Sequence, residues 1–257
     1  MIFYKISNLD PHIRGDKIVS SRTYEGNLPG KLGLIQRRIV KCRVCTRLVK
    51  HREKISMTKR AFFDHCDYWG APVPSNGDPK ARVLIIGLAP GAHGANRTGR
   101  MFTGDPSATF LTSALYRTGF ATLPDSSHIG DGLSLKDVFI TSALHCVPPQ
   151  DKAVMLEQNN CRDFLIQELH QLRGIKAVLA LGKVAFDNYV KAVSVIHNES
   201  YNLKFGHNLS FDMSPKTPML FCSYHPSPRN TYTKRLDAKD LDAILFRIKD
   251  FLLKTSG

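Results

Sequence analysis

A short apolar strand followed by a glycine-rich loop is the feature that most restricts how this chain can fold. Residues 82–86 read Arg-Val-Leu-Ile-Ile, a run typical of a buried parallel strand. The next nineteen residues, 87–105, contain five glycines and a proline, which excludes a helix or a strand interior. Open α/β sheets bind ligands at loops leaving the carboxyl ends of parallel strands. We therefore expect an α/β sheet with a ligand site at this loop.

Three further apolar runs indicate strands, and helical patterns separate them. We predict a three-layer α/β fold whose central, mainly parallel four-stranded sheet carries helices on both faces. Ser107 is able to cap the helix that follows the glycine loop. The predicted strands cover 82–87, 137–143, 175–181 and 219–223, and the predicted helices cover 29–54, 107–118, 152–173, 183–193 and 236–254.

The remaining segments bear on domain organisation. Residues 64–80 are rich in turn formers and should form a long connection, and 194–217 are compatible with an antiparallel excursion. No linker interrupts the alternation of strands and helices. We therefore expect a polar N-terminal extension over 1–28 and a single α/β domain over 29–257.

Charge and hydropathy narrow the class of protein. Lysine and arginine number 36 against 22 acidic residues, a net charge of +14 that favours a polyanion partner, most often nucleic acid. No apolar run reaches the ~18 residues that a membrane helix needs, and the N-terminus lacks a signal-peptide pattern. We expect an intracellular, cytoplasmic or nucleoid protein that makes no membrane contact and is a monomer.

Four of the six cysteines form a candidate metal site. Cys42 and Cys45 have the spacing at which two thiolates can bind one metal centre. Cys146 and Cys161 could complete either an iron–sulfur cluster or a zinc site, and spacing alone does not choose between them. Cys66 and Cys222 are expected to be small buried hydrophobic residues, with Cys66 the substitute if one ligand is wrongly assigned.

A histidine follows the last predicted strand in a setting that suits a functional side chain. His225 begins the run His-Pro-Ser-Pro-Arg-Asn, and its two prolines fix the backbone around it. The carboxyl ends of parallel strands lie along one edge of a sheet. His225 should therefore meet the glycine loop, Ser142 and Cys146 there.

These motifs resemble those of a known enzyme family. Residues 87–106 are similar to the first motif of family 5, or type b, uracil-DNA glycosylases, and 225–236 are similar to their second. Cys42, Cys45, Cys146 and Cys161 stand where that family and its family 4 relatives hold a 4Fe-4S cluster. The resemblance spans roughly residues 35 to 250.

The resemblance implies a monofunctional DNA-repair hydrolase. Such an enzyme hydrolyses the N-glycosidic bond of uracil that is flipped out of DNA and leaves an abasic site. By similarity, Asp105 positions or activates the attacking water, and His225 hydrogen-bonds the base carbonyl that gains negative charge. The cluster would be structural, and a sliding clamp is a compatible partner. The remaining implied residues are Phe102, which stacks on the base, Gly91, Ala92 and Ser142, which line its pocket, and Arg229, Asn230 and Arg235, which contact DNA.

Two departures from family 4 shape the predicted chemistry. Leu88 replaces the carboxylate that those enzymes keep after the first loop glycine, so Asp105 becomes the catalytic candidate. Ser142 replaces an asparagine that reads the uracil edge, which predicts looser discrimination, with hypoxanthine and xanthine accepted beside uracil.

Two other functions stay open at this point. One is a non-catalytic, zinc-containing nucleic-acid-binding protein. The other is a nucleotide hydrolase, which the absence of a Walker lysine pattern and of G-x-G-x-x-G disfavours.

Overall fold

Four parallel strands form the centre of the sheet. The computed structural model describes residue 26 and residues 28–255. Within them the six strands are ordered β1-β3-β2-β4-β6-β5. All four predicted strands are present, and their apolar side chains are buried almost throughout because helices cover both sides of the sheet. The central strands are β2 (Val83–Gly87), β3 (Val138–Ser142), β4 (Ala177–Leu181) and β6 (Met219–Ser223).

The sheet is wider than the four strands predicted. β1 (Asn76–Gly77) pairs antiparallel with β3, and β5 (Ser210–Phe211) pairs antiparallel with β6. Each added strand is two residues long, too short to show an alternating pattern, and Asn-Gly reads as a turn. β5 confirms the antiparallel excursion expected within 194–217.

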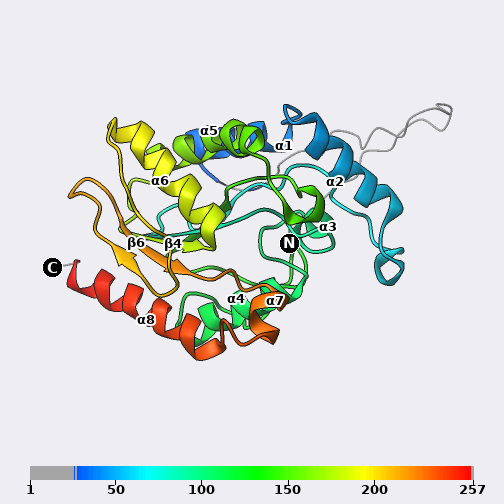
Figure 1. Ribbon diagram of the computed structural model, residues 1–257. Helices are drawn as coiled ribbons and strands as arrows, with labels where there is room; N and C mark the ends of the chain where they lie inside the picture. The colour runs from blue at the N-terminus through cyan, green and yellow to red at the C-terminus, as the bar shows by residue number, and fades with distance from the viewer. Residues whose placement is uncertain (1–25, 27, 256–257) are drawn as a thin grey trace.

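Alternate residues of each central strand enter opposite cores. Val83, Ile85 and Leu179 pack with residues of α4 (Pro106–Arg117) and α8 (Ala238–Lys254). Leu84 and Val178, from the other face, pack with residues of α1 (Gly30–Val40), α5 (Met155–Gln171) and α6 (Lys183–His197). Figure 1 shows α4 and α8 below the sheet and α1, α5 and α6 above it. The predicted three-layer arrangement is confirmed.

The helix predicted over 29–54 is two helices. α1 ends at Val40, and α2 (Thr46–Thr58) begins after a non-helical segment that contains both Cys42 and Cys45. The sequence lacks a proline or glycine that would mark this break. Four short helices also occur in connecting segments of the described chain, and they are η1 (Ala61–Phe63), α3 (Ala95–Thr98), η2 (Pro149–Asp151) and α7 (Pro228–Tyr232). α3 lies within the glycine loop, between Gly94 and Gly99, so the expectation that no helix occurs in 87–105 is wrong for these four residues.

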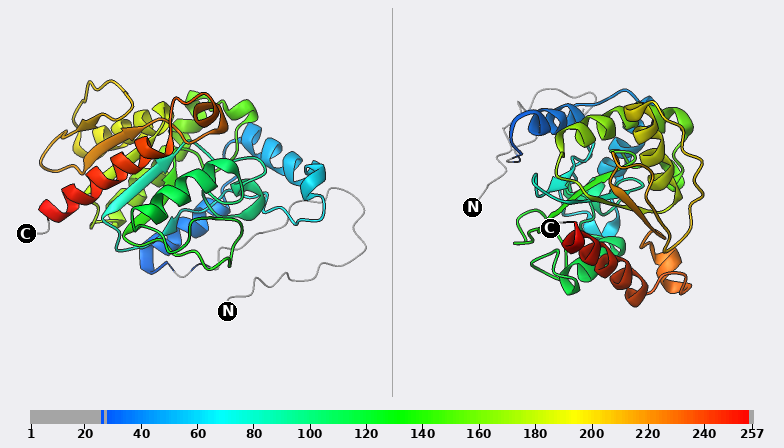
Figure 2. Two further views of the ribbon diagram at one scale, coloured as in Figure 1. Left: turned by 90° about the horizontal axis from the view of Figure 1, so that it is seen from below. Right: turned by 90° about the vertical axis from the view of Figure 1, so that its left-hand side faces the viewer.

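The strand order places a crevice beside the glycine loop. β2 lies between β3 and β4, so the chain adds β3 on one side of β2 and later adds β4 on its other side. The carboxyl end of such a strand is where open α/β sheets bind ligands. Figure 2 shows α4, which follows the glycine loop, lying beside α8.

Two predictions concern the ends of the chain and the membrane. The predicted polar extension over 1–28 lies outside the described residues, apart from 26 and 28. No helix in the described part of the chain is long and apolar enough to cross a membrane.

Candidate active site

Side chains of the glycine loop hold the loop in its own conformation. Arg97 donates from Nε to the His93 carbonyl at 2.7 Å and from Nη2 to the Gly104 carbonyl at 3.0 Å. Its guanidinium also lies 4.0 Å from the centre of the Phe63 ring, in η1. Arg97 therefore stabilises the conformation of the loop that carries Asp105.

A partly buried ion pair fastens the loop to the segment that precedes β3. Arg100 donates to both carboxylate oxygens of Asp131, at 3.0 and 2.6 Å, and to the Ser126 hydroxyl. Burial raises the pKa of Asp131, but hydrogen bonds from Arg100 and backbone amides outweigh it and hold that pKa at about 2. The Ser126 carbonyl in turn accepts from the Gly104 amide at 2.7 Å. Through Ser126, the ion pair therefore helps to hold Gly104, the residue that precedes Asp105.

Asp105 has two roles, one for each carboxylate oxygen. Oδ1 accepts from the Ala108 amide at 2.9 Å, so Asp105 is the N-cap of α4, and the expectation that Ser107 caps this helix is wrong. Oδ2 lies against Gly91 and Gly94, where a Cβ would meet it. Burial raises the pKa of Asp105, and hydrogen bonds from backbone amides of α4 partly oppose this rise. Helix capping therefore fixes one oxygen and leaves the other facing the loop glycines.

A cavity of about 660 Å³, here called the strand-end pocket, opens at the carboxyl ends of the strands. It gathers six of the predicted site residues and falls within the size range of ligand pockets. Ala92, Asn230 and Arg235 are not among its lining residues. The predicted residues that do line it are Gly91, Phe102, Asp105, Ser142, His225 and Arg229.

Phe102 and His225 form one wall of this pocket. Their rings stack with centroids 5.9 Å apart and an interplanar angle of 28°. Phe102 has φ of +46°, a conformation uncommon for a bulky residue and often found at functional sites. Its ring packs so closely over Gly87 that a Cβ there would lie 2.9 Å from it. Burial lowers the pKa of His225 to about 4, so its imidazole is neutral at pH 7.

The Ser142 hydroxyl already has an acceptor for its proton. Oγ donates to the Leu144 carbonyl at 2.6 Å, and Met101 Sδ lies 3.6 Å away. A hydroxyl has one donor and two acceptor lone pairs. Toward a ligand in the pocket, Ser142 therefore offers an acceptor.

Polar residues after His225 have two different roles. One holds the turn around the histidine, and the others are exposed at the surface. Asn230 donates from Nδ2 to the His225 carbonyl at 2.8 Å, which closes the turn around the histidine. Arg235 is exposed and its guanidinium lies 4.8 Å from the Tyr224 ring centre. Arg229 is exposed at the rim of the strand-end pocket. Lys234, also exposed, has φ of +55°, a region that favours glycine.

The four predicted metal cysteines come from three segments that meet beside the pocket. Cys146 and Cys161 are buried, and Cys45 packs against the same small core around Leu48 and Leu144. Arg52 donates to Cys146 Sγ at 3.1 Å. Burial raises the pKa of Cys146 to about 11, despite the charge of Arg52, and the neighbouring Cys42 and Cys45 raise it further.

Asn160 donates to Cys45 Sγ at 3.5 Å, a second polar contact to a sulfur of the group. Cys222 lies buried within β6, as expected for a core residue, whereas Cys66 is half-buried and lines a different cavity. Across the described residues, no group of three or more His, Cys, Asp or Glu side chains is placed so that it could hold a metal ion, so the predicted metal site stays a prediction. Nothing described therefore supports the zinc alternative.

Sequence reasoning missed one wall of the strand-end pocket. Gln150, Asp151 and Lys152 line it, from a short helical turn that precedes α5. Gln150 and Asp151 have φ of +55° and +56°, and the charge of Asp151 also raises the pKa of Asp105. The preceding Pro148-Pro149 pair was the available signal, because it predicts an irregular turn at the sheet edge.

Comparisons with known proteins agree with the site. The sequence profile of the Uracil DNA glycosylase superfamily matches residues 74–249. The Type-5 uracil-DNA glycosylase of Pyrobaculum aerophilum is 40% identical over 210 residues, which cover 82% of this chain and 88% of that protein. That of Thermus thermophilus is 39% identical over 208 residues, covering 81% and 92%.

Type-4 relatives match a smaller part of the chain. The Type-4 uracil-DNA glycosylase of Pyrobaculum aerophilum is 33% identical over 114 residues, 44% of this chain and 50% of that protein. The Type-5 matches are longer, at 210 and 208 residues. The chain belongs to the uracil-DNA glycosylase superfamily, and among the relatives described here the Type-5 enzymes match it over the greater length.

Proposed function

We propose that this chain hydrolyses the N-glycosidic bond of uracil in DNA and leaves an abasic site. The observation that carries the proposal is the strand-end pocket, which Asp105 and His225 line from two loops far apart in sequence. Relatives named uracil-DNA glycosylase at about 40% identity support the same reaction. The target base must leave the duplex to enter such a pocket, which costs a few kcal/mol and less for a mispaired base.

Asp105 is the proposed base for the attacking water. The glycosidic C1′–N bond breaks with its electron pair going to the base, and positive charge develops on the sugar. Water adds its oxygen to C1′ and gives its proton to the Asp105 carboxylate. Burial raises the pKa of this carboxyl, which makes it a better proton acceptor. Its negative charge also opposes the charge developing on the sugar.

His225 is the proposed partner of the leaving base. With a pKa of about 4 it is neutral at pH 7 and donates one N–H. That donor can hydrogen-bond the carbonyl oxygen on which negative charge gathers as the bond breaks. Asn230 holds the carbonyl of this residue, so the imidazole is positioned before substrate arrives.

Ser142 is the proposed reader of the base edge. Because its proton is engaged with the Leu144 carbonyl, it accepts from a ligand rather than donating. Uracil and hypoxanthine both present a ring N–H between or beside carbonyl groups, whereas cytosine and adenine present an acceptor nitrogen there. We therefore propose that uracil and hypoxanthine are released and that cytosine and adenine are rejected.

A base-release panel tests the reaction and the role of Asp105. Duplexes carrying uracil, hypoxanthine, xanthine or cytosine are incubated with the wild-type chain and with Asp105→Asn. Asparagine keeps the helix cap but not the proton acceptor, so release should be lost while DNA binding and stability persist. Full activity of Asp105→Asn would move the water-activating role elsewhere, and no release of any base by the wild type would refute the proposed function.

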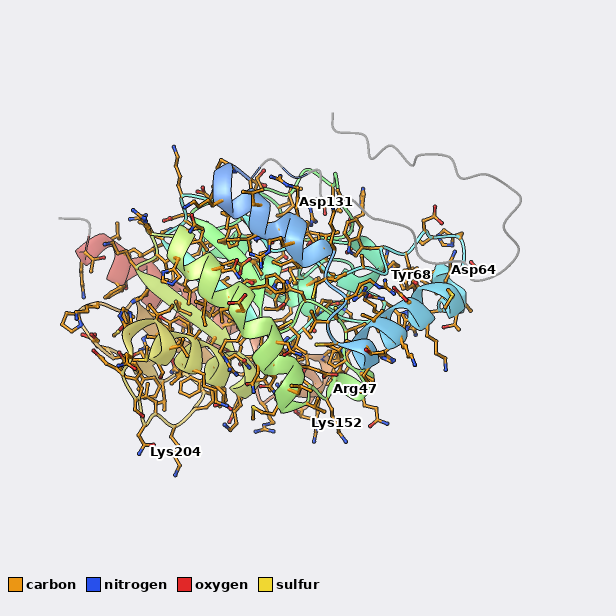
Figure 3. All side chains as sticks on the ribbon, turned by 90° about the horizontal axis from the view of Figure 1, so that it is seen from above. Arg47, Asp64, Tyr68, Asp131, Lys152 and Lys204 are labelled. Atoms are coloured by element: carbon orange, nitrogen blue, oxygen red, sulfur yellow. The ribbon has the colours of Figure 1, made fainter. Side chains whose placement is uncertain are left out.

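We also propose that Cys42, Cys45, Cys146 and Cys161 hold a 4Fe-4S cluster. Three features support it, namely the thiol-rich core, the two N–H donors aimed at sulfur, and the break between α1 and α2 that frees Cys42 and Cys45 from helical geometry. Bound there, such a cluster would cross-link the segment between α1 and α2 to the segments that carry Cys146 and Cys161, and it would take no part in bond cleavage. Figure 3 shows Arg47 beside Lys152, where Arg47 also donates to the Lys152 carbonyl at 3.0 Å and joins α2 to the start of α5.

Iron and sulfide content with the visible spectrum test the cluster. The wild-type protein should contain about four irons per chain and absorb visible light. Cys146→Ser should lose most of both, whereas Cys222→Ala, which removes a buried cysteine outside the group, should keep them. Equal iron content in the two variants would contradict the ligand assignment.

A further inference from the structure

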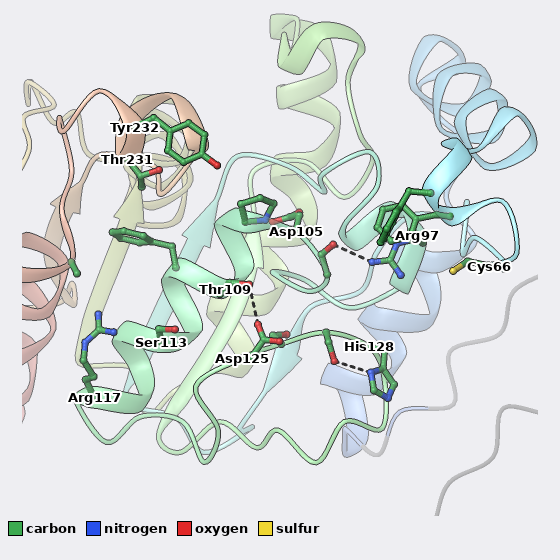
Figure 4. A pocket seen from close by; sticks show the side chains of 18 of the residues that line it. Cys66, Arg97, Asp105, Thr109, Ser113, Arg117, Asp125, His128, Thr231 and Tyr232 are labelled. Atoms are coloured by element: carbon green, nitrogen blue, oxygen red, sulfur yellow. Dashed lines mark hydrogen bonds between the residues drawn. The ribbon is translucent and has the colours of Figure 1, made fainter.

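A second and larger cavity adjoins the strand-end pocket. This outer groove has a volume of about 1000 Å³, at the upper end of the range for ligand sites. Asp105 lines both cavities, so the two meet at the proposed catalytic carboxylate. Figure 4 shows Asp105 between Arg97 on one side of the groove and Tyr232 on the other. A DNA strand that places one nucleotide at Asp105 therefore has space for another beside it.

Exposed aromatic rings line this groove from two different elements. Tyr232 at the end of α7 is 80% exposed, and Phe62 of η1 is 76% exposed. Among the large hydrophobic side chains of the described residues, these two are the most exposed. Both line the same cavity although 170 positions separate them in sequence. Large apolar surface left open beside an active site marks a binding surface.

The Phe62 ring is supported from behind. It meets the Phe63 ring edge-on, with centroids 4.9 Å apart, and Arg97 covers Phe63. Phe110 and Pro106 of α4 add apolar surface to the groove. This edge-on contact reduces the entropy that the Phe62 side chain would lose when a ligand covers it.

The charges in the groove favour a flat apolar ligand over a phosphate. Arg97 is already bound to two carbonyls, and Arg117 is paired with Asp242 at 2.7 Å. Asp125 adds a negative charge, where it accepts from the Thr109 hydroxyl at 2.9 Å. Aromatic faces next to paired cations suit the stacking of a nucleobase, which every base can provide.

We propose that the outer groove binds the nucleobase of the nucleotide that flanks the excised one on the same strand, stacked on Phe62 or Tyr232. The proposal rests on the proposed function, because that function brings the strand to Asp105. It gives these two aromatic residues a role in substrate binding that is separate from bond cleavage.

Binding measurements on the whole protein test the proposal. Wild type, Phe62→Ala and Tyr232→Ala are titrated with duplexes that carry a non-hydrolysable deoxyuridine analogue. The control is Phe246→Ala, which removes an aromatic residue 47% exposed on α8 that does not line the groove. At least one groove variant should weaken binding by roughly 5- to 100-fold, the range for loss of one base stacked on an aromatic ring. The control should stay within about twofold both in binding and in single-turnover cleavage by saturating enzyme, and the affected groove variant should lose more in binding than in that cleavage rate.

Duplexes with one missing base identify the occupant. An abasic analogue is placed 5′ of the target, 3′ of it, or opposite it. One flanking placement should weaken wild-type binding by the same factor as the aromatic substitution, and the two changes together should add no further loss. Loss confined to the opposite placement, or no loss at either flank, would overturn the proposal. A wild-type protein that releases no base would instead refute the function on which the proposal rests.

Discussion

A single added methyl group at Gly91 should disable the proposed catalytic carboxylate. A Cβ at this position would lie 2.5 Å from Asp105 Oδ2, about 0.9 Å inside the 3.4 Å at which ordinary contact begins. Gly91 is not among the residues with positive φ, so its backbone admits alanine. Since Oδ1 is held by the Ala108 amide, Oδ2 must retreat by rotating the carboxylate. A displacement of about 1 Å at a reacting group costs on the order of 100-fold in rate, equivalent to about 2.7 kcal/mol.

Single-turnover release of uracil by saturating enzyme measures this effect, because it isolates the chemical step from binding. Gly91→Ala should lower the rate about 100-fold and leave DNA affinity and the urea midpoint close to wild type. Gly206→Ala is the matched control, since its new Cβ meets only the side chain of Leu209, which can move. A Gly91→Ala rate within threefold of wild type would refute the view that Oδ2 is the working oxygen.

Three further predictions concern stability. Asp105→Ala should lower the free energy of unfolding by about 1 kcal/mol relative to Asp105→Asn, because alanine cannot cap α4, and equal urea midpoints would exclude the cap. Burial lowers the pKa of His225 from the ordinary value of about 6.5 to about 4 in the folded chain, so its contribution to stability is present above pH 6.5 and is lost as the pH falls toward 4. Wild type should therefore lose about 3 kcal/mol more than His225→Gln between pH 7 and pH 4 in urea titrations, and parallel pH profiles would contradict this. Asp131→Asn should lower the free energy of unfolding by about 2 kcal/mol, because it leaves the partly buried Arg100 without its charge partner, and a change below about 0.5 kcal/mol in the same assay would show that the pair is dispensable.

The central strands were predictable because their signal is local. Each is a short apolar run that must be covered on both faces, and such runs have few other structures open to them. The edge strands β1 and β5 were not predictable, because two residues are too few to show an alternating hydrophobic pattern. They form strands only because β3 and β6 lie beside them. The break between α1 and α2 was missed because the segment around Cys42 contains no proline or glycine that would end a helix.

The candidate site divides in a similar way. The sequence by itself determined the glycine loop and the placement of His225 after the last strand, because residue type and order along the chain suffice to state them. The preference for Asp105 over the position of Leu88 came from the family resemblance and stays a prediction. Only the tertiary structure decided that Asp105 also caps α4, that Ser142 has no free proton, and that Asn230 supports His225 from behind. Only the fold brought Phe62 and Tyr232 to one groove. Hydrogen-bond partners and shared cavities depend on distances between segments remote in sequence, and those distances exist only after the strands have aligned.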